Sequence, residues 1–292
     1  MTDDELIAAY EAKGVPVCET CRILQVSRAG YYRRRLRLLQ CKPVHVRCNE
    51  EVAGLTEMIR HIAAEHPFWG YRRITWFLRR KRGILANRKR VRRIMRAEGL
   101  SVPVERYKAK RLDMRPKPRP TRVNEWWGTD MTKFYVEHVG WVYLVVVIDW
   151  FTKNAIGSAL GVRPSTDLWL QALRMAVITA CPHGSREYGI HLMSDNGSQP
   201  TSKRYEKELQ MLGIDHVTTS YNNPKGNADT ERFMRTFKEE VVWPNEFDSF
   251  EEAIRAVEVF IGFYNCDYPH SKHNGMSPID FEKSLSQTAE AA

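Results

Sequence analysis

The sequence predicts a layered α/β domain in the second half of the chain, preceded by a basic all-α region. Three observations indicate this. Residues 128–161 contain three apolar runs of strand length joined by short turns, and helical and strand patterns alternate after them. Residues 1–100 show helical periodicity. The two parts of the chain also carry opposite net charge.

The charge division favours nucleic acid as a partner. Residues 1–122 contain 30 Lys and Arg against 12 Asp and Glu, a net charge of +18, whereas residues 123–292 contain 15 against 23, a net charge of −8. Because solvated surfaces usually mix the two signs, we expect the basic part to bind DNA. The sequence lacks an apolar run of about 18 residues and a signal-peptide pattern, so we expect a cytoplasmic protein with no membrane partner.

The first basic segment has a helix-turn-helix outline. Helices are expected over residues 3–14, 17–26 and 28–39, with Ser27 as the N-cap of the third. The third would be the recognition helix, although three short helices also form ordinary bundles. The residues expected to contact DNA from it are Arg28, Tyr31, Arg33 and Arg34.

A second basic block follows in "HPFWGYRRITWFLRRKRG" and "NRKRVRRIMRAEGL". Apolar residues recur at helical spacing in both, and Asn87 is the expected N-cap of the second helix. The arginines outnumber the local acids, so phosphate contact explains them better than ion pairing. The candidate contacts are Arg72, Arg73, Arg88, Lys89 and Arg92.

These patterns predict five segments. Residues 1–48 form the helix-turn-helix, 49–100 the second basic helical domain, 101–123 a basic linker rich in proline, 124–283 the α/β core and 284–292 a tail. Cys18 and Cys21 have a C-x-x-C spacing compatible with zinc or redox chemistry. No second pair completes such a site, which favours reduced thiols packed among the helices.

Three acids in the α/β half are candidate metal ligands. Asp130 falls inside the first predicted strand, Asp195 at the end of the fourth, and Glu231 in the first turn of the helix after the fifth. Singly, each has an ordinary explanation as a turn former or a helix N-terminal acid. Together, clustered carboxylates repel one another unless a cation lies among them, and such oxygen ligands suit Mg²⁺ or Mn²⁺.

The helix that carries Glu231 also carries two cations. Arg235 and Lys238 follow at i+4 and i+7 on the same face, while Phe233, Phe237 and Val241 are expected on the buried face. We expect the two cations to contact DNA phosphates. The alternative is an i, i+4 pair of Glu231 with Arg235, worth only roughly 0.2–0.5 kcal/mol.

The acids and their surroundings resemble a known family. Asp130 in "WWGTDMTKF", Asp195 in "SDNGSQPTS" and Glu231 in "NNPKGNADTERFMRTFKEE" are similar to the DDE motif of retroviral-integrase-like transposases, with 35 residues between the second and third acids. The chain further resembles the second-frame product of the insertion-sequence-three family of bacterial transposases from about residue 5 to 283. The segments that carry this resemblance are "CRILQVSRAGYYRRR", "HPFWGYRRI", "NRKRVRRIMRAEGL" and "YNCDYPHSKHNGMSPIDF".

The resemblance implies an RNase H-like catalytic core with a mixed five-stranded sheet and flanking helices. It implies that Asp130, Asp195 and Glu231 hold two Mg²⁺ or Mn²⁺ ions, and that water and then a DNA 3′-hydroxyl attack phosphate in end cleavage and strand transfer. It implies double-stranded transposon-end and target DNA as partners, self-association into a synaptic dimer or higher oligomer, and an upstream-frame product or a fusion with it. The location implied is the bacterial cytoplasm, on the nucleoid when DNA is bound.

Two positions qualify the resemblance. Pro200 stands where the family commonly has an aromatic residue, and it is expected to reshape the loop after Asp195 without removing a ligand. Asp149 is a further family-like acid, expected to be structural. Two other functions share parts of the pattern: a structure-selective RNase H-type nuclease, and a DNA-binding regulator derived from an inactive transposase.

Overall fold

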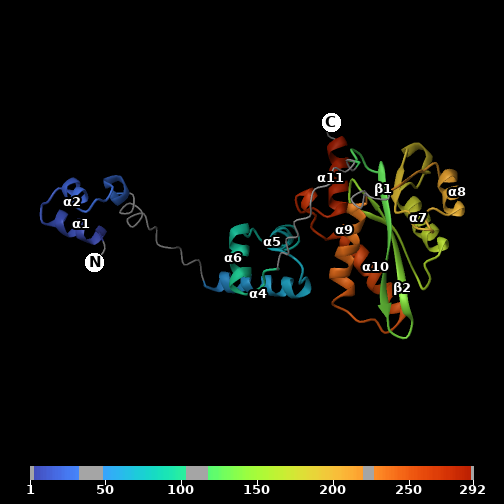
Figure 1. Cartoon of the computed structure of the whole chain (residues 1–292), viewed down its shortest axis with the longest axis horizontal. Coiled ribbons are helices and arrows are strands. Elements are labelled where there is room, and N and C mark those ends of the chain that lie inside the picture. Colours follow the sequence, from blue (N-terminus) through green and yellow to red (C-terminus); the bar gives the residue numbers. More distant parts are fainter. Residues whose placement is uncertain (1–2, 33–48, 103–117, 220–226, 291–292) are drawn as a thin grey trace. The chain divides into compact units, whose positions relative to one another are not determined.

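The structure is a computed structural model that describes residues 3–32, 49–102, 118–219 and 227–290 (Figure 1). The chain divides into two compact units, Met1–Glu57 and Met58–Ala292. The elements carry the labels of Figure 1.

The first unit contains helices α1 (Asp3–Ala12) and α2 (Val17–Ile23), and a third helix that starts at residue 28 and is described as far as residue 32. Ser27 stands before this helix, and its Oγ accepts a long hydrogen bond of 3.4 Å from Gly30 N. All three helices begin where the sequence predicts. Arg33 and Arg34 lie outside the described residues.

Tyr31 corrects a prediction. It packs with Ile7, Val17 and Cys21 in the small core of this unit and is 2% exposed. Its hydroxyl lies 3.3 Å from Glu11. The ring is therefore part of the core and not available for DNA, and the exposed aromatic residue of this helix is Tyr32.

The basic block consists of α4 (Asn49–Glu65), which belongs to the second unit from Met58 on, and of α5 (Tyr71–Arg80) and α6 (Arg88–Ala97), which lie in that unit entirely. Asn87 is the N-cap of α6, as predicted, and its Oδ1 accepts from Lys89 N at 2.8 Å. Arg79 donates two hydrogen bonds to the Ala86 carbonyl and so closes the turn between α5 and α6. The apolar stripes predicted for α5 and α6 are buried at Ile74, Leu78 and Val91, together with Ile59 and Ile62 of α4.

The α/β part is built on one mixed sheet of five strands in the order β3-β2-β1-β4-β5. The strands are β1 (Trp126–Val136), β2 (Gly140–Asp149), β3 (Ala155–Gly161), β4 (His191–Ser194) and β5 (Asp215–Thr218). The first three are antiparallel neighbours, whereas β1, β4 and β5 run parallel. This is the predicted order of three antiparallel strands followed by alternating helix and strand.

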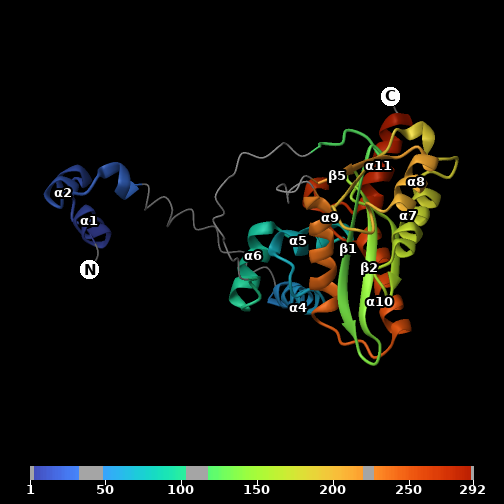
Figure 2. The same ribbon diagram turned by 45° about the vertical axis from the view of Figure 1, so that its right-hand side comes forward.

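Helices cover both faces of this sheet (Figure 2). The first face carries α7 (Thr166–Ala180) and α8 (Lys203–Leu212), which pack on Trp127 and Leu192. The other carries α9 (Ala228–Phe237) and α10 (Phe250–Cys266). Side chains of Ser165, Ser202 and Ser249 cap α7, α8 and α10, because each accepts a backbone N–H of the first turn.

Two helical features were not predicted from the sequence: a helix at the C-terminal end, and a π-helical turn after α9. The chain after the 3₁₀ turn η3 (Ser271–His273) forms a helix, α11 (Pro278–Glu290), so the predicted tail 284–292 is helical as far as Glu290. The predicted helix that carries Glu231 continues as far as Val242, but it is not α-helical throughout. It changes at Phe237 into the π-helical turn η2 (Lys238–Val242), where Trp243 N donates to Lys238 O at 2.9 Å. No helix in the described part of the chain is long and apolar enough to cross a membrane.

Candidate active site

Asp130 lies on β1, and Asp195 directly follows β4, the parallel strand beside β1. Gly128 of β1 pairs with Met193 of β4, so Asp130 and Asp195 each follow their paired residue by two positions. Asp130 Oδ1 accepts from Met131 N at 2.8 Å, and Asp195 Oδ1 accepts from Gly197 N at 3.2 Å. Parallel pairing thus brings to one place two residues that stand far apart in the sequence.

The third acid, Glu231, lies on α9, and the first turn of this helix packs against β1 at Gly128. A Cβ at Gly128 would lie 2.3 Å from Thr230 Oγ1 and 2.1 Å from Trp150 Nε1. The glycine therefore permits a close approach of helix to strand. Trp150 Nε1 also donates to Thr230 Oγ1 at 3.3 Å, beside Glu231.

Two further contacts hold the start of α9. Asn227 Nδ2 donates 2.9 Å to the carbonyl of Thr129, the residue before Asp130. The buried ammonium of Lys153 lies 2.6 Å from Asp229 Oδ2 and donates to Trp150 O at 2.7 Å. The sequence reasoning missed Asn227 and Lys153. Of these features only Gly128 has a signal in the sequence, because a glycine inside a strand often marks the close approach of another backbone segment.

The three acids influence one another electrostatically. Burial raises the pKa of Asp130 to about 6, and the charges of Asp195 and Glu231 contribute to this rise. The Met131 N–H and the charge of Lys238 act in the opposite direction. Among the described residues, however, no three His, Cys, Asp or Glu side chains are close enough to hold a metal ion. The donor set nevertheless fits a hard divalent cation, since carboxylate oxygens are its ligands and a cation relieves this repulsion.

A hydrogen-bonded chain fixes the backbone at Asp195. Ser194 Oγ donates to Asp195 O at 2.8 Å and lies 2.8 Å from His216 Nε2 on β5. Burial lowers the pKa of His216, which favours the neutral ring. Asn196 Nδ2 donates to Thr219 O and ties the loop to the end of β5.

Asp149 and Pro200 have positions compatible with structural roles. Asp149 accepts from Phe151 N at 2.8 Å and from Thr152 Oγ1 at 3.1 Å, and its burial raises its pKa. It closes the turn between β2 and β3. Pro200 is buried in the turn that precedes α8 and packs near Gly197.

The cations on the helix of Glu231 differ in their surroundings. Lys238 is close enough to Asp130 to oppose the rise of its pKa. Nε of the exposed Arg235 forms an ion pair at 2.8 Å with Oε1 of Glu239, whose side chain is largely buried. The opposite stripe is buried as predicted, at Phe233, Phe237 and Val241.

Four candidate DNA contacts of the basic block lie on its exposed surface: Arg72, Arg88, Lys89 and Arg92. Arg88 stands 5.8 Å over the Trp76 ring, and Arg92 stands 5.5 Å over Tyr71. Arg73 is half-buried and lies 4.9 Å over the ring of Tyr268, so part of its side chain is covered within the unit.

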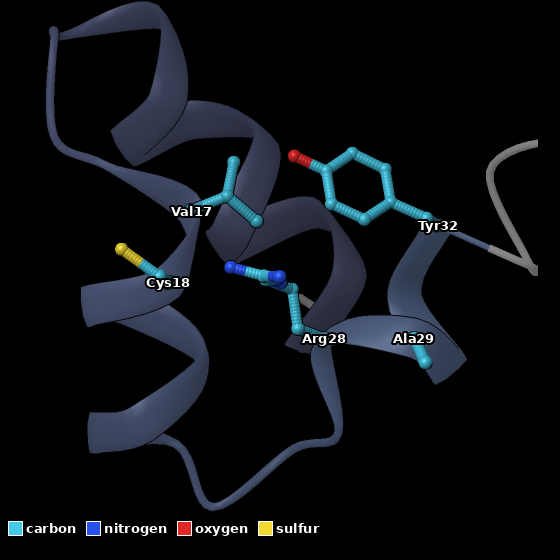
Figure 3. Close-up of a pocket in the computed structure, with 5 residues that line it drawn as sticks. All are labelled: Val17, Cys18, Arg28, Ala29 and Tyr32. Carbon is cyan, nitrogen blue, oxygen red and sulfur yellow. The ribbon is translucent and has the colours of Figure 1, made fainter.

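In the first unit, Arg28 lines a hollow between α2 and the start of the third helix (Figure 3). Val17 and Cys18 form one side of this hollow, and Ala29 and Tyr32 the other. Cys18, Cys21, Cys181 and Cys266 are free thiols. No zinc-like group of four ligands is present in the described part of the chain.

Comparison with known proteins places these features in a family. Integrase core domain models match residues 120–224 and 212–278, and an HTH-like domain model matches residues 49–108. The transposase for insertion sequence element IS904 of Lactococcus lactis subsp. lactis (strain IL1403) is 32% identical over 242 residues, which cover 78% of this chain and 93% of that protein. The chain belongs to the insertion-sequence-three family of transposases.

A second member of this transposase family aligns along nearly the whole chain. The putative transposase InsK for IS150 of Escherichia coli (strain K12) is 31% identical over 277 residues, covering 91% of this chain and 93% of that protein. Among solved structures, the HTLV-2 integrase catalytic core in complex with magnesium covers 56% of this chain and 99% of that one, at 17% identity and a TM-score of 0.43. The family models and the sheet order confirm the predicted RNase H-like core.

Proposed function

We propose that this transposase cleaves the ends of an insertion sequence and joins them to target DNA, with water and then a DNA 3′-hydroxyl as nucleophile. The observation that carries the proposal is the convergence on Asp130. Asp195 follows the strand that pairs with β1, Glu231 lies on α9, and the charges of both raise the pKa of Asp130. Three carboxylates whose charges act on one another are suited to phosphoryl chemistry at bound divalent ions.

Asp130, Asp195 and Glu231 would hold two Mg²⁺ or Mn²⁺ ions. Bound ions supply activation of the attacking oxygen and stabilisation of the leaving 3′-oxygen. Within the described part of the chain the three carboxylates do not form a group of three that could hold one ion together. A pH near 7 is above the Asp130 pKa of about 6, so the carboxyl group is mostly ionised, as a metal ligand must be.

The chain's own cations would hold the DNA. Lys238 lies near Asp130 and would contact the phosphates of the bound end, with Arg235 one turn earlier. Arg72, Arg88, Lys89 and Arg92 would contact phosphates farther along the duplex, and Arg28, Arg33 and Arg34 would act from the first unit. We also propose a synaptic dimer or higher oligomer, an upstream-frame partner or fusion, and action in the bacterial cytoplasm.

The domain division proposed from the sequence keeps residues 1–48 and 49–100 as two DNA-binding segments joined by the linker 101–123 to the core. The HTH-like family model over residues 49–108 supports the second of them. A structure-selective nuclease would share the acids, but strand transfer would distinguish it from a transposase.

The first prediction tests the three acids. Asp130→Asn, Asp195→Asn and Glu231→Gln should each abolish Mg²⁺- or Mn²⁺-dependent cleavage and joining, because the amide has nearly the same size but no charge to bind the ion. DNA affinity should stay within about twofold, since phosphate contacts by cations supply most of it. Cleavage and joining are measured on labelled end DNA, and affinity is measured separately by titration.

Asp149→Asn is the matched control. Asp149 is also a buried carboxylate on the sheet, but it accepts its hydrogen bonds from Phe151 and Thr152 in the turn that follows it. In folded protein it should keep cleavage and joining. An acid of the three whose amide variant cleaved at the wild-type rate would leave the proposed metal site.

A further inference from the structure

A buried carboxylate on the catalytic core is held by two side chains of the basic block. Glu240 has a side chain only 5% exposed. Trp69 Nε1 donates to its Oε1 at 2.7 Å, and His66 Nδ1 lies 2.7 Å from its Oε2. Because an ionised carboxylate only accepts, His66 carries a hydrogen on Nδ1 and donates it. Each oxygen of Glu240 thus has a donor from one short segment, 171 and 174 residues away in sequence.

Ring packing fixes the two donors. The His66 ring stacks on Trp69 with centroids 3.9 Å apart and planes 9° apart. On α10, Phe263 stacks on His66 at 5.1 Å. Stacked rings lose little further freedom when they donate a hydrogen bond, so the donors are already oriented toward the carboxylate.

Other contacts also attach the basic block to the core. Lys81 Nζ lies 2.7 Å from Asp267 Oδ1, and the ring of Trp76 packs where a Cβ on Gly275 would stand. These contacts reach the connection between α10 and α11. The Glu240 contacts reach a different place, the turn η2, whose first residue is Lys238.

We propose that His66 and Trp69 are positioning residues. By holding Glu240 they fix the π-helical turn that presents Lys238 toward Asp130. The expected effect of His66 and Trp69 on DNA joining rests on the proposed function. Their expected effect on the turn η2 rests on the structure alone.

The test compares Trp69→Phe with Trp76→Phe in the full-length protein. Trp69→Phe keeps an aromatic ring for stacking but removes the donor to Glu240. Trp76→Phe makes the same change at a residue of the same block that packs on the core beside Gly275. Single-turnover joining of end DNA at saturating DNA should fall about tenfold for Trp69→Phe and less than about twofold for Trp76→Phe, since small misplacements near the chemistry are costly. DNA affinity should change little in either.

A double-mutant cycle separates positioning from general destabilisation. In a Lys238→Ala background, Trp69→Phe should cause no further loss, because the residue it positions is gone. Equal losses by Trp69→Phe in both backgrounds, or equal losses by the two tryptophan variants, would overturn the proposal.

Hydrogen exchange tests the turn without reference to activity. The Trp243 amide, which donates to Lys238 O, should exchange at least about tenfold faster in Trp69→Phe and at the wild-type rate in Trp76→Phe. Unchanged exchange would sink the inference even if joining fell. Conversely, a wild-type protein that joined no DNA would contradict the proposed function, and the exchange result would still test the positioning role of Trp69.

Should Trp69→Phe fail to fold, Glu240→Gln replaces it. Glutamine keeps a carbonyl acceptor for Trp69 and removes the charge that His66 meets. Faster exchange at Trp243 and a joining loss that disappears in the Lys238→Ala background are expected, and wild-type behaviour in both measurements would contradict the positioning role.

Discussion

Asp130 shows how one side chain can be costly to the fold and useful to the site. Its carboxylate lies in β1, largely buried, and its one backbone hydrogen bond does not offset the burial and the charges of Asp195 and Glu231. The pKa of about 6 expresses this imbalance. A residue of this kind lowers the stability of the metal-free protein and gains its function when a cation is bound.

The second prediction follows from this pKa. The folded value of about 6 stands above the ordinary value of 3.8, so the folded state holds the proton more tightly and stability falls as pH rises from about 4 to about 6. Asp130→Asn removes this loss. In the presence of a chelator, the variant should exceed the wild type in unfolding free energy by up to about 3 kcal/mol above about pH 6.5, and the gain should vanish below about pH 4.

Urea unfolding at a series of pH values measures this difference. Asp248→Asn, which changes an exposed acid just before α10, is the control and should show no comparable pH-dependent gain. A gain that was constant from about pH 4 to about pH 8 would assign the effect to packing instead of charge.

At the scale of elements, the site depends on how α9 begins. Its first turn is held by Asn227 on the carbonyl before Asp130, by Lys153 on Asp229, and by the closeness that Gly128 permits. The same helix ends in the π-helical turn, where Glu240 contacts the basic block. One helix thus joins the sheet beside two of the acids to the region that carries the arginines proposed to bind DNA.

The third prediction concerns this closeness. Gly128→Ala places a methyl group within 2.3 Å of Thr230 and 2.1 Å of Trp150, so α9 has to move away from β1. We expect a stability loss of about 1–3 kcal/mol from overpacking and a fall in joining of at least about tenfold in the protein that remains folded.

Gly157→Ala is the matched control. Its Cβ would lie 2.2 Å from Ala172 O, so the clash is equally close but falls between β3 and α7. It should lower the melting temperature similarly and leave the joining rate of the folded protein near wild type. If both variants lost joining in proportion to stability, the approach of α9 would have no special role.

For the whole molecule, charge is divided between the two halves of the chain, and α5 and α6 of the basic block lie within the same compact unit as the catalytic core. The contacts of the block with the core through Glu240, Asp267 and Gly275 leave Arg88, Lys89 and Arg92 exposed. DNA bound by these residues would therefore be held by the same packing that orients the acids.

The fourth prediction is the salt dependence of DNA binding by the full-length chain. Replacing Arg88, Lys89 and Arg92 together with alanine should reduce the slope of log affinity against log salt by roughly 2 to 3, at about 0.9 for each phosphate that is no longer neutralised. Affinity at low salt should fall, whereas helix content should not change, because these side chains are exposed and α6 keeps its Asn87 cap.

A triple variant of Lys203, Arg204 and Lys207 on α8 removes the same charge from an exposed helix of the core and is the control. A smaller change in slope is expected from it. Equal changes from the two triple variants would show that net charge, and not the α6 surface, determines DNA binding.

The sequence by itself determined the elements and the identity of the three acids. Strand runs, the helix cap at Asn87, and the spacing of Asp195 and Glu231 are local or one-dimensional signals, and local hydrogen bonding and periodicity decide them. The same signals predicted Tyr31 as a DNA contact, because helical spacing does not show which neighbouring residues bury a ring. They also did not predict the π-helical turn. Only the tertiary structure decided what meets across the chain: Asn227 with Thr129, Lys153 with Asp229, and Glu240 with His66 and Trp69. Partners separated by many residues are chosen by packing of the whole fold, and a single sequence carries no local mark of that choice.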